Sequence, residues 1–331
     1  MTRGAFRIEH PIGLDGLLVL RVRDGDVRIR AVERDTVIVD ARDGDAAASL
    51  SVERGTGSLT VTAGPGVATP DLGLDVPVGA TVLIEASSSD VKARGLTGQQ
   101  RYHTTSGDVE LRDVAGDLSV EAVSGDIAIG TIAPASIAAR TVSGDLAVKA
   151  TVLATLRAST TSGDLIIDTV FAGEGPYSVE TVSGDANLTS RGPVRVEAST
   201  LTGSISSDGD VAAQGPGNAR VLEAGRGGPT IRFRSTSGDL HLDARGVDSP
   251  AAIAALATPP APPAPPKPPA PPAPPAPLEP SSPVAPTEDP AMAVLQALER
   301  GEIDPAEAAR RLDAAPRPEA APRPEAEGDR S

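Results

Sequence analysis

The sequence of 331 residues has no cysteine and no tryptophan, and aromatic residues make up only 2% of it. The absence of cysteine excludes disulfide bonds and thiol chemistry. Large globular cores usually depend on more aromatic volume than this chain contains. A thin core filled by Val, Leu, Ile, Ala and Thr has no such need, so the composition favours a thin, layered fold.

Long hydrophobic runs are also absent. Residues 1–16 carry Arg3, Arg7, Glu9 and Asp15, and they lack the continuous apolar run of a secretory signal. No stretch reaches the ~18 apolar residues that a membrane-spanning helix requires. We therefore expect a cytoplasmic protein without a membrane span, with peripheral association with the envelope as the alternative.

Basic residues are fewer than acidic ones: the sequence has 30 Lys and Arg residues and 45 Asp and Glu residues, which gives a net charge of −15. This excess of negative charge opposes binding to nucleic-acid backbones and to anionic membrane surfaces. One interpretation of the acidity is metal or cation binding. The simpler interpretation is solubility, with many aspartates serving turns.

The most informative feature present is a tripeptide, Ser-Gly-Asp, followed by an apolar-x-apolar step. It occurs at residues 106–108, 124–126, 143–145, 162–164, 183–185 and 237–239, with weaker copies at 115–117 and 202–204. Gly125, Gly144 and Gly163 are spaced by 19 residues, and some intervals are split into halves of nine. A fixed period of this kind predicts stacked repeats.

The residues around each tripeptide alternate with period two, which predicts strands. Before Gly163, the residues of one parity change from Leu156 through Ala158 to Thr160, so this face becomes smaller toward the glycine. A corner that closes onto a narrow interior needs such a taper. The glycine can adopt a positive φ, and the Asp carboxylate can accept hydrogen bonds from backbone N–H groups. We therefore interpret Ser-Gly-Asp as a corner.

These patterns predict an all-β fold, a parallel β-solenoid or β-helix with coils of about 19 residues, each made of two strands and two turns. We expect six to ten coils in residues 1–248, with residues 1–20 as an amino-terminal cap. Gly25 and Gly44 show the same spacing of 19, so the period begins early. The glycine-rich interval from Gly203 to Gly238 predicts a long loop or a distorted coil.

The remaining chain has a different composition. Residues 249–288 are rich in Pro and Ala and predict an extended polyproline II linker. Residues 289–314 predict a short helical hairpin, because Asp289-Pro290 and Asp304-Pro305 are helix starts and Gly301 ends the first helix. Its apolar face predicts a partner-binding surface made of Val294, Leu295, Leu298, Ile303 and Leu312. Residues 315–331 predict a disordered tail.

Two resemblances follow from these motifs. The run Thr-x-Ser-Gly-Asp-apolar-x-apolar, with Val76-Pro77-x-Gly79 ahead of it, resembles the bacterial "putative adhesin" β-strand repeat family, a domain of unknown function, over about residues 5–245. The segment from Leu295 to Leu312 resembles the short helical domain of the YvlB and LiaX envelope-stress proteins and, more loosely, SHOCT domains. The resemblances imply adhesion or an envelope-stress role. In those relatives the helical unit often precedes the β domain, whereas here it follows.

The sequence contains few features that indicate catalysis or metal binding. The candidate calcium ligands are the corner carboxylates Asp108, Asp126, Asp145, Asp164 and Asp185. Tight calcium sites need six to eight oxygens, whereas each corner offers one carboxylate, so turn capping is the simpler interpretation. Glycoside cleavage by paired carboxylates would normally be accompanied by aromatic rings that stack sugars. His10, His103 and His241 show no metal-ligand spacing, and no phosphate-binding or dinucleotide motif is present. We expect no catalytic residues and no cofactor.

The sequence therefore predicts a non-enzymatic β-solenoid scaffold or binding protein with a tethered helical module. The module would recruit a protein partner or mediate self-association. The first alternative is a self-polymerising cytosolic β-helix scaffold of the bactofilin kind. A calcium-binding solenoid is the second.

Overall fold

The computed structural model describes residues 6–41, 50–64 and 68–245. The chain divides into two units, residues 1–263 and 264–331, and the second lies outside the described residues. The predicted linker (249–288), helical hairpin (289–314) and tail (315–331) also lie outside them. Every regular element of the described part is a β-strand, as an all-β prediction requires.

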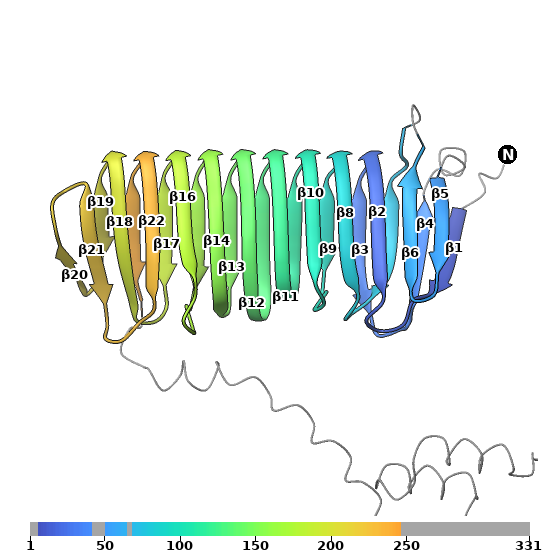
Figure 1. Cartoon of the computed structure of the whole chain (residues 1–331), viewed down its shortest axis with the longest axis horizontal. Coiled ribbons are helices and arrows are strands. Elements are labelled where there is room, and N and C mark those ends of the chain that lie inside the picture. The colour runs from blue at the N-terminus through green and yellow to red at the C-terminus, as the bar shows by residue number, and fades with distance from the viewer. Residues whose placement is uncertain (1–5, 42–49, 65–67, 246–331) are drawn as a thin grey trace, which may run out of the picture. The chain divides into compact units, whose positions relative to one another are not determined.

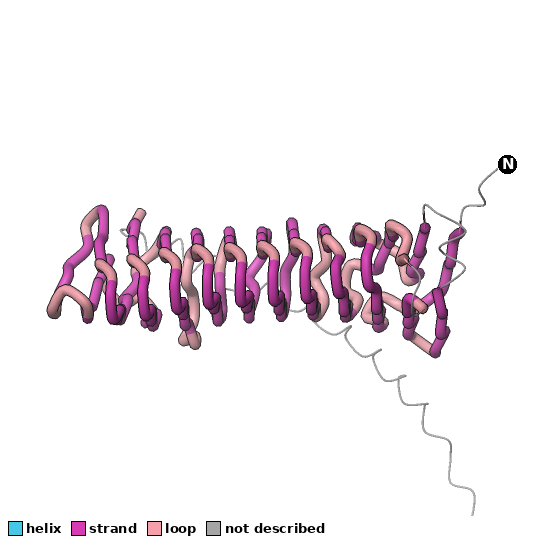
Figure 2. The backbone as a smooth tube through the Cα atoms, turned by 90° about the horizontal axis from the view of Figure 1, so that it is seen from above, coloured by secondary structure: helices cyan, strands magenta, loops and turns pink. Residues whose placement is uncertain are grey.

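Each repeat forms a rung of two strands, one on each face of a stack (Figure 1). In a typical rung, β14 (Leu153–Ser162) lies on one face, the chain turns at Gly163, and β15 (Leu165–Thr169) lies on the other. We call the first face, which leads into the Ser-Gly-Asp corner, face one, and the second face two. Figure 2 shows the rungs as successive turns of the backbone tube.

The strands divide between the faces as follows. Face one also contains β2 (Leu17–Asp24), β5 (Leu50–Gly55), β6 (Ser58–Ala63), β8 (Thr81–Ser88), β10 (Gln100–Ser106), β16 (Tyr177–Ser183), β18 (Val194–Thr202), β20 (Val211–Gln214), β21 (Ala219–Ala224) and β22 (Thr230–Ser237). Face two also contains β1 (Phe6–Pro11), β3 (Val27–Val32), β4 (Thr36–Ala41), β7 (Leu72–Pro77), β9 (Val91–Arg94), β13 (Leu146–Ala150), β17 (Ala186–Ser190), β19 (Ile205–Asp208) and β23 (Leu240–Ala244). The long strands β11 (Val109–Ser124) and β12 (Ile127–Ser143) begin on face two and end on face one.

Neighbouring rungs pair in parallel, and equivalent residues of the repeat stand in register. Ser124 pairs with Ser143, Ser143 with Ser162, and Ser162 with Ser183, so the corners form one straight file. The predicted taper is present, because Leu156, Ala158 and Thr160 all point inward and are at most 4% exposed. The prediction of a parallel stack with aligned corners is confirmed.

The order of the rungs in space differs from their order in the sequence at both ends. The rung β2–β3 lies between β6–β7 and β8–β9, because β2 pairs with both β6 and β8. In the same way, β22–β23 lies between β16–β17 and β18–β19. At the amino-terminal end the chain forms the inner rung β2–β3 first, then the outermost rung β6–β7, and then β8–β9 on the other side of β2–β3. At the carboxyl-terminal end it forms the outermost rung β18–β19 first, and β22–β23 then occupies the position between β18–β19 and β16–β17.

The described residues contain ten two-stranded rungs, within the predicted range of six to ten. Their spatial order is β6–β7, β2–β3, β8–β9, β10–β11, β11–β12, β12–β13, β14–β15, β16–β17, β22–β23 and β18–β19.

One expectation about the irregular regions needs correction. The interval from Gly203 to Gly238 is neither a loop nor one distorted coil, because it contains β19, the antiparallel strands β20 and β21, and the inserted strand β22. Gly44, which marks the spacing of 19 after Gly25, lies outside the described residues. After Gly25 the chain forms β3, which belongs to a rung, and then β4, which pairs antiparallel with β1 and β7.

Antiparallel strands flank the stack on both faces at one end and on face one at the other. At one end β5 pairs with β6, and β4 joins β7 to β1. At the other end β21 pairs with β18 and β20 with β21. The predicted cap of residues 1–20 differs from this arrangement, since β1 is an edge strand but Leu17 and the residues after it belong to β2, inside the stack. Short or charged edge strands of this kind limit pairing with other chains.

Candidate functional site

The regular corner depends first on its glycines. Gly163 has a φ of +139°, and a Cβ built on it would lie 2.1 Å from the carbonyl oxygen of Gly144 on the preceding rung. The left-handed conformation is costly for residues with a side chain, and the approach of the two backbones leaves no room for one. Where a corner stacks this closely on the preceding one, as at Gly163, the position therefore requires glycine.

The aspartates that follow the glycines link one rung to the next. In each case a carboxylate Oδ1 accepts a hydrogen bond from the backbone N–H of the aspartate on the neighbouring rung. The N···O distances are 2.9 Å from Asp126 to Asp108, 2.8 Å from Asp145 to Asp126, 2.8 Å from Asp164 to Asp145, 2.9 Å from Asp185 to Asp164 and 2.9 Å from Asp239 to Asp185. We call this file the aspartate ladder. It gives every predicted calcium ligand a structural role in the turn.

The ladder spreads its carboxylates along the stack instead of gathering them around one point. Adjacent members lie one rung apart, about 4.8 Å in a β-sheet. Among the described residues, no group of three or more His, Cys, Asp or Glu side chains could hold a metal ion together. Calcium binding at Asp108, Asp126, Asp145, Asp164 and Asp185 stays a prediction.

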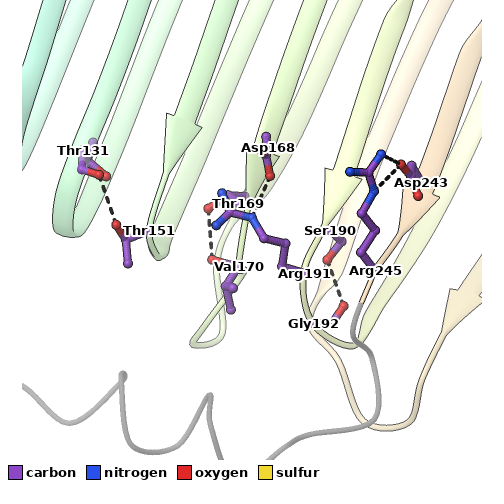
Figure 3. Close-up of polar contacts among 10 residues, drawn as sticks. All are labelled: Thr131, Thr151, Asp168, Thr169, Val170, Ser190, Arg191, Gly192, Asp243 and Arg245. Atoms are coloured by element: carbon purple, nitrogen blue, oxygen red, sulfur yellow. Dashed lines mark hydrogen bonds and ion pairs between the residues drawn. The ribbon is translucent and has the colours of Figure 1, made fainter.

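The opposite edge of the stack, the lower edge in Figure 1, has no repeated chemistry. Figure 3 shows that its contacts differ from rung to rung. Arg191 Nε donates to Asp168 Oδ1 at 2.8 Å, Arg245 Nε donates to Asp243 Oδ2 at 2.7 Å, and Ser190 Oγ donates to a backbone carbonyl at 2.9 Å. Because each turn there is stabilised individually, the repeat constrains only the aspartate edge.

The two faces differ in how their arginines are paired. On face two, each arginine that projects from a described strand meets a carboxylate: Arg7 with Asp40, Arg28 with Asp26, Arg30 with Asp75, Arg94 with Asp113 and Arg112 with Glu110. The hydrogen bond and charge of Asp75 raise the pKa of Arg30. The arginine charges on face two are therefore compensated by carboxylates of the protein itself.

Face one is different, because several of its arginines have no ion-pair partner in the part of the chain that the structure describes. These are Arg101, Arg140, Arg157 and Arg234. All four are exposed to solvent. Face one therefore offers guanidinium groups that remain available to an external anion.

Two of these arginines line a hollow of about 530 Å³ on face one. Arg101 is in register with Ser119, Ser119 with Ala138, and Ala138 with Arg157. The Cα atoms of the two arginines are thus three rungs, or about 14 Å, apart. Small side chains form the floor between them, and Asp117 is the carboxylate among the lining residues. We call this feature the arginine hollow.

The sequence interpretation missed the arginine hollow. Its signal becomes visible when the rungs are aligned on their glycines, because Arg101, Ser119, Ala138 and Arg157 then occupy one position of the repeat. The predicted partner-binding residues Val294, Leu295, Leu298, Ile303 and Leu312 lie outside the described residues.

The three histidines lie on different strands and do not form one site. His10 Nε2 is 3.0 Å from the carbonyl oxygen of Gly55, and His103 Nδ1 is 3.6 Å from Glu121. His241 Nε2 is 3.4 Å from Asp208. Within the described strands and turns, there is also no helix that is long and apolar enough to cross a membrane.

Comparisons with known proteins identify one family. The sequence model described as Toastrack DUF4097 matches this chain over residues 14–175 and again over residues 74–243. No curated protein matches the sequence.

The solved structures that this chain is similar to include the following three. A "putative adhesin" from Bacteroides fragilis is 11% identical, with 73% of this chain and 98% of that chain covered and a TM-score of 0.43. A "putative lipid binding protein" from Parabacteroides distasonis is 11% identical, with 73% and 97% covered and a TM-score of 0.37. A "putative adhesin" from the same species is 12% identical, with 73% and 98% covered and a TM-score of 0.29.

Proposed function

Since this chain belongs to the Toastrack DUF4097 family, we propose that it is a non-enzymatic scaffold that binds a partner on the faces of its β-repeat stack. The observation that carries the proposal is the aspartate ladder, which joins successive rungs through hydrogen bonds of 2.8–2.9 Å. A stack fixed in this way holds the outward side chains at constant intervals. It resembles a rigid platform more than a cleft that closes around a substrate.

The proposal includes a role for the carboxyl-terminal segment. Residues 289–314 would act as a tethered helical module that recruits a protein partner or a second copy through Val294, Leu295, Leu298, Ile303 and Leu312. Some 25 residues bury too little surface to be stable alone, which supports a need for a partner. The physiological setting that we propose is adhesion or the bacterial envelope-stress response, with the protein in the cytoplasm or attached peripherally to the envelope.

A pull-down with two separate baits tests the proposal. Residues 1–248 and residues 249–331 are immobilised separately and incubated with a lysate and with envelope extract of the source bacterium. We expect the first bait to retain an envelope component and the second to retain a protein partner or the full-length chain. Leu298→Asp should abolish capture by the second bait. If neither bait retains more than empty beads, the scaffold function is wrong.

A further inference from the structure

We propose that the arginine hollow binds a linear glycan that carries carboxylate groups. This inference rests on the binding function proposed above and names the ligand class of face one. The arginine hollow lies mainly on β10, β11, β12 and β14. The ligand would lie along the stack axis, with its carboxylates on Arg101 and Arg157.

The first argument is that both arginines are free to bind. Neither Arg101 nor Arg157 makes an ion pair with a described residue, although acidic residues outnumber basic residues in the chain by 45 to 30. A guanidinium donates two parallel N–H bonds to a carboxylate, which is the planar geometry that the group matches best. Two such groups about 14 Å apart select a ligand with more than one acidic group over a single small anion.

The second argument is the distance of the arginine hollow from the main negative charge of the stack. Arg101 precedes the corner at Gly107 by six residues of extended strand, which span about 20 Å. The Debye length at physiological ionic strength is about 8 Å. The charges of the aspartate ladder are therefore largely screened at the arginine hollow. The local potential depends on the groups that line it and on the nearer carboxylates of face one, Glu85, Glu121 and Glu180.

The third argument is the hydrogen-bonding character of the lining. Beside the apolar side chains of Leu17 and Leu83, residues Gln99, Ser119, Ser136 and Thr155 present amide and hydroxyl groups to the arginine hollow. These groups can donate to and accept from sugar hydroxyls. No outward-facing aromatic ring belongs to the described lining residues, so binding by ring stacking is not available there. The affinity should thus depend on carboxylates and fall as salt is added.

Asp117 is the titratable group that opposes an anionic ligand. It lies in register with Ser136, beside the file that contains the two arginines. Its repulsion would keep a carboxylate away from that side and direct the ligand along the line from Arg101 to Arg157. The nearest further carboxylate on β11, Glu121, is 3.6 Å from His103.

Isothermal titration of the full-length protein with an oligogalacturonate tests the proposal. We expect wild-type protein to bind, and Arg101→Gln and Arg157→Gln each to weaken binding about tenfold, the effect of one charged hydrogen bond. Asp117→Asn should strengthen binding. The matched control is Lys149→Gln, which makes the same charge change on face two and should change the affinity by less than about twofold. A neutral dextran oligomer of equal length should not bind.

Several outcomes would overturn the proposal. Equal losses in Lys149→Gln and the arginine variants would show that only net charge matters. Binding of dextran, or tighter arginine-dependent binding of single-stranded DNA or anionic vesicles, would show that the ligand class is wrong. If oligogalacturonate does not bind while residues 1–248 still retain an envelope protein, the glycan inference fails and the scaffold function stands. If both experiments are negative, both proposals fail.

Discussion

At the scale of the residue, the glycine and the aspartate of each corner have separate tasks. The glycine allows the backbones of two rungs to approach, and the aspartate supplies the hydrogen bond between them. The sequence predicts both roles, because a positive φ and a carboxylate acceptor are local properties of a turn. The pattern of free and paired arginines is harder to predict, since it depends on which residues of other rungs stand alongside.

Because the corner requires glycine, adding a single methyl group at Gly163 should lower the stability strongly. Gly163→Ala should lower the stability by at least about 3 kcal/mol, because it adds left-handed strain to a contact of 2.1 Å with the Gly144 carbonyl oxygen. Gly130→Ala is the matched control, because its φ is not in the left-handed region and its added Cβ would be 3.7 Å from the nearest atom. Thermal unfolding followed by circular dichroism measures both. Similar melting temperatures for the two variants would contradict the corner geometry.

The aspartate ladder makes a prediction that separates hydrogen bonding from charge. Asp145→Ala removes the acceptor for the Asp164 N–H and should cost about 1 kcal/mol. Asp145→Asn keeps an acceptor oxygen and removes one member of a file of like charges, whose neighbours repel by about 1 kcal/mol in water. Urea denaturation should therefore find the Asn variant at least as stable as wild type. Equal losses in both variants would contradict the ladder, and a melting temperature raised by calcium would favour the calcium alternative.

The buried tyrosines predict a loss of stability in alkaline solution. Burial raises the pKa of Tyr177 to about 12, and it raises the pKa of the fully buried Tyr102 well above its ordinary value. In the unfolded chain both groups titrate near pH 10. Above that pH the unfolded state releases protons that the folded state keeps, so the stability present below about pH 10 should fall as the pH approaches 12.

Urea midpoints measured across this pH range test the effect in wild-type protein and in Tyr177→Phe. The variant loses the hydrogen bonds from Tyr177 to the carbonyl oxygens of Ala172 and Leu153, so it should be less stable at neutral pH. Its additional loss above pH 10 should be smaller than that of wild type. If the urea midpoint falls equally steeply with pH above 10 in both proteins, the ionisation of Tyr177 does not cause the loss of stability.

At the scale of the element, the strands were predictable and their spatial order at the ends was not. The period-two pattern around each glycine specifies strand, corner and inward face without any distant information. It does not specify the neighbour, because all rungs share one pattern. Nothing local distinguishes the observed pairing of Tyr177 with Ile231 from a pairing with Val196. A reading in sequence order therefore misses both inserted rungs.

The inserted rung predicts an unusual gradient of backbone protection. β22 and β23 lie later in the sequence than β18 to β21, yet they have paired strands on both sides. In hydrogen exchange followed by mass spectrometry, residues 230–244 should exchange more slowly than β19 and β20, which lie at the end of the stack. Faster exchange of β22 than of β20 would contradict this topology.

At the scale of the whole molecule, the covered ends favour a stack of finite length. Parallel rungs that ended bare would offer two templates for end-to-end growth. Here antiparallel strands follow the last parallel rungs on both faces at one end of the described stack and on face one at the other, where the remaining edge strand, β19, has only 4 residues. This arrangement favours a discrete species over the filaments expected of the bactofilin-like alternative.

Light scattering over a range of protein concentrations tests this expectation. We expect one discrete oligomer that does not grow with concentration, and Leu298→Asp should convert it to a monomer. Filaments that lengthen with concentration would support the self-polymerising alternative instead. A monomer that is unaffected by Leu298→Asp would contradict both forms of self-association.

The inserted rung also has a consequence for how the protein is made. During translation, β16 to β21 leave the ribosome before β22 and β23. Until β22 and β23 follow, the rungs β16–β17 and β18–β19 therefore lack the rung that pairs with both of them. A nascent chain that is interrupted after Ala224 lacks this rung, and its bare strand edges are accessible to proteases and to aggregation. Residues 230–244 therefore complete this end of the stack only after all the strands on either side of them have been synthesised.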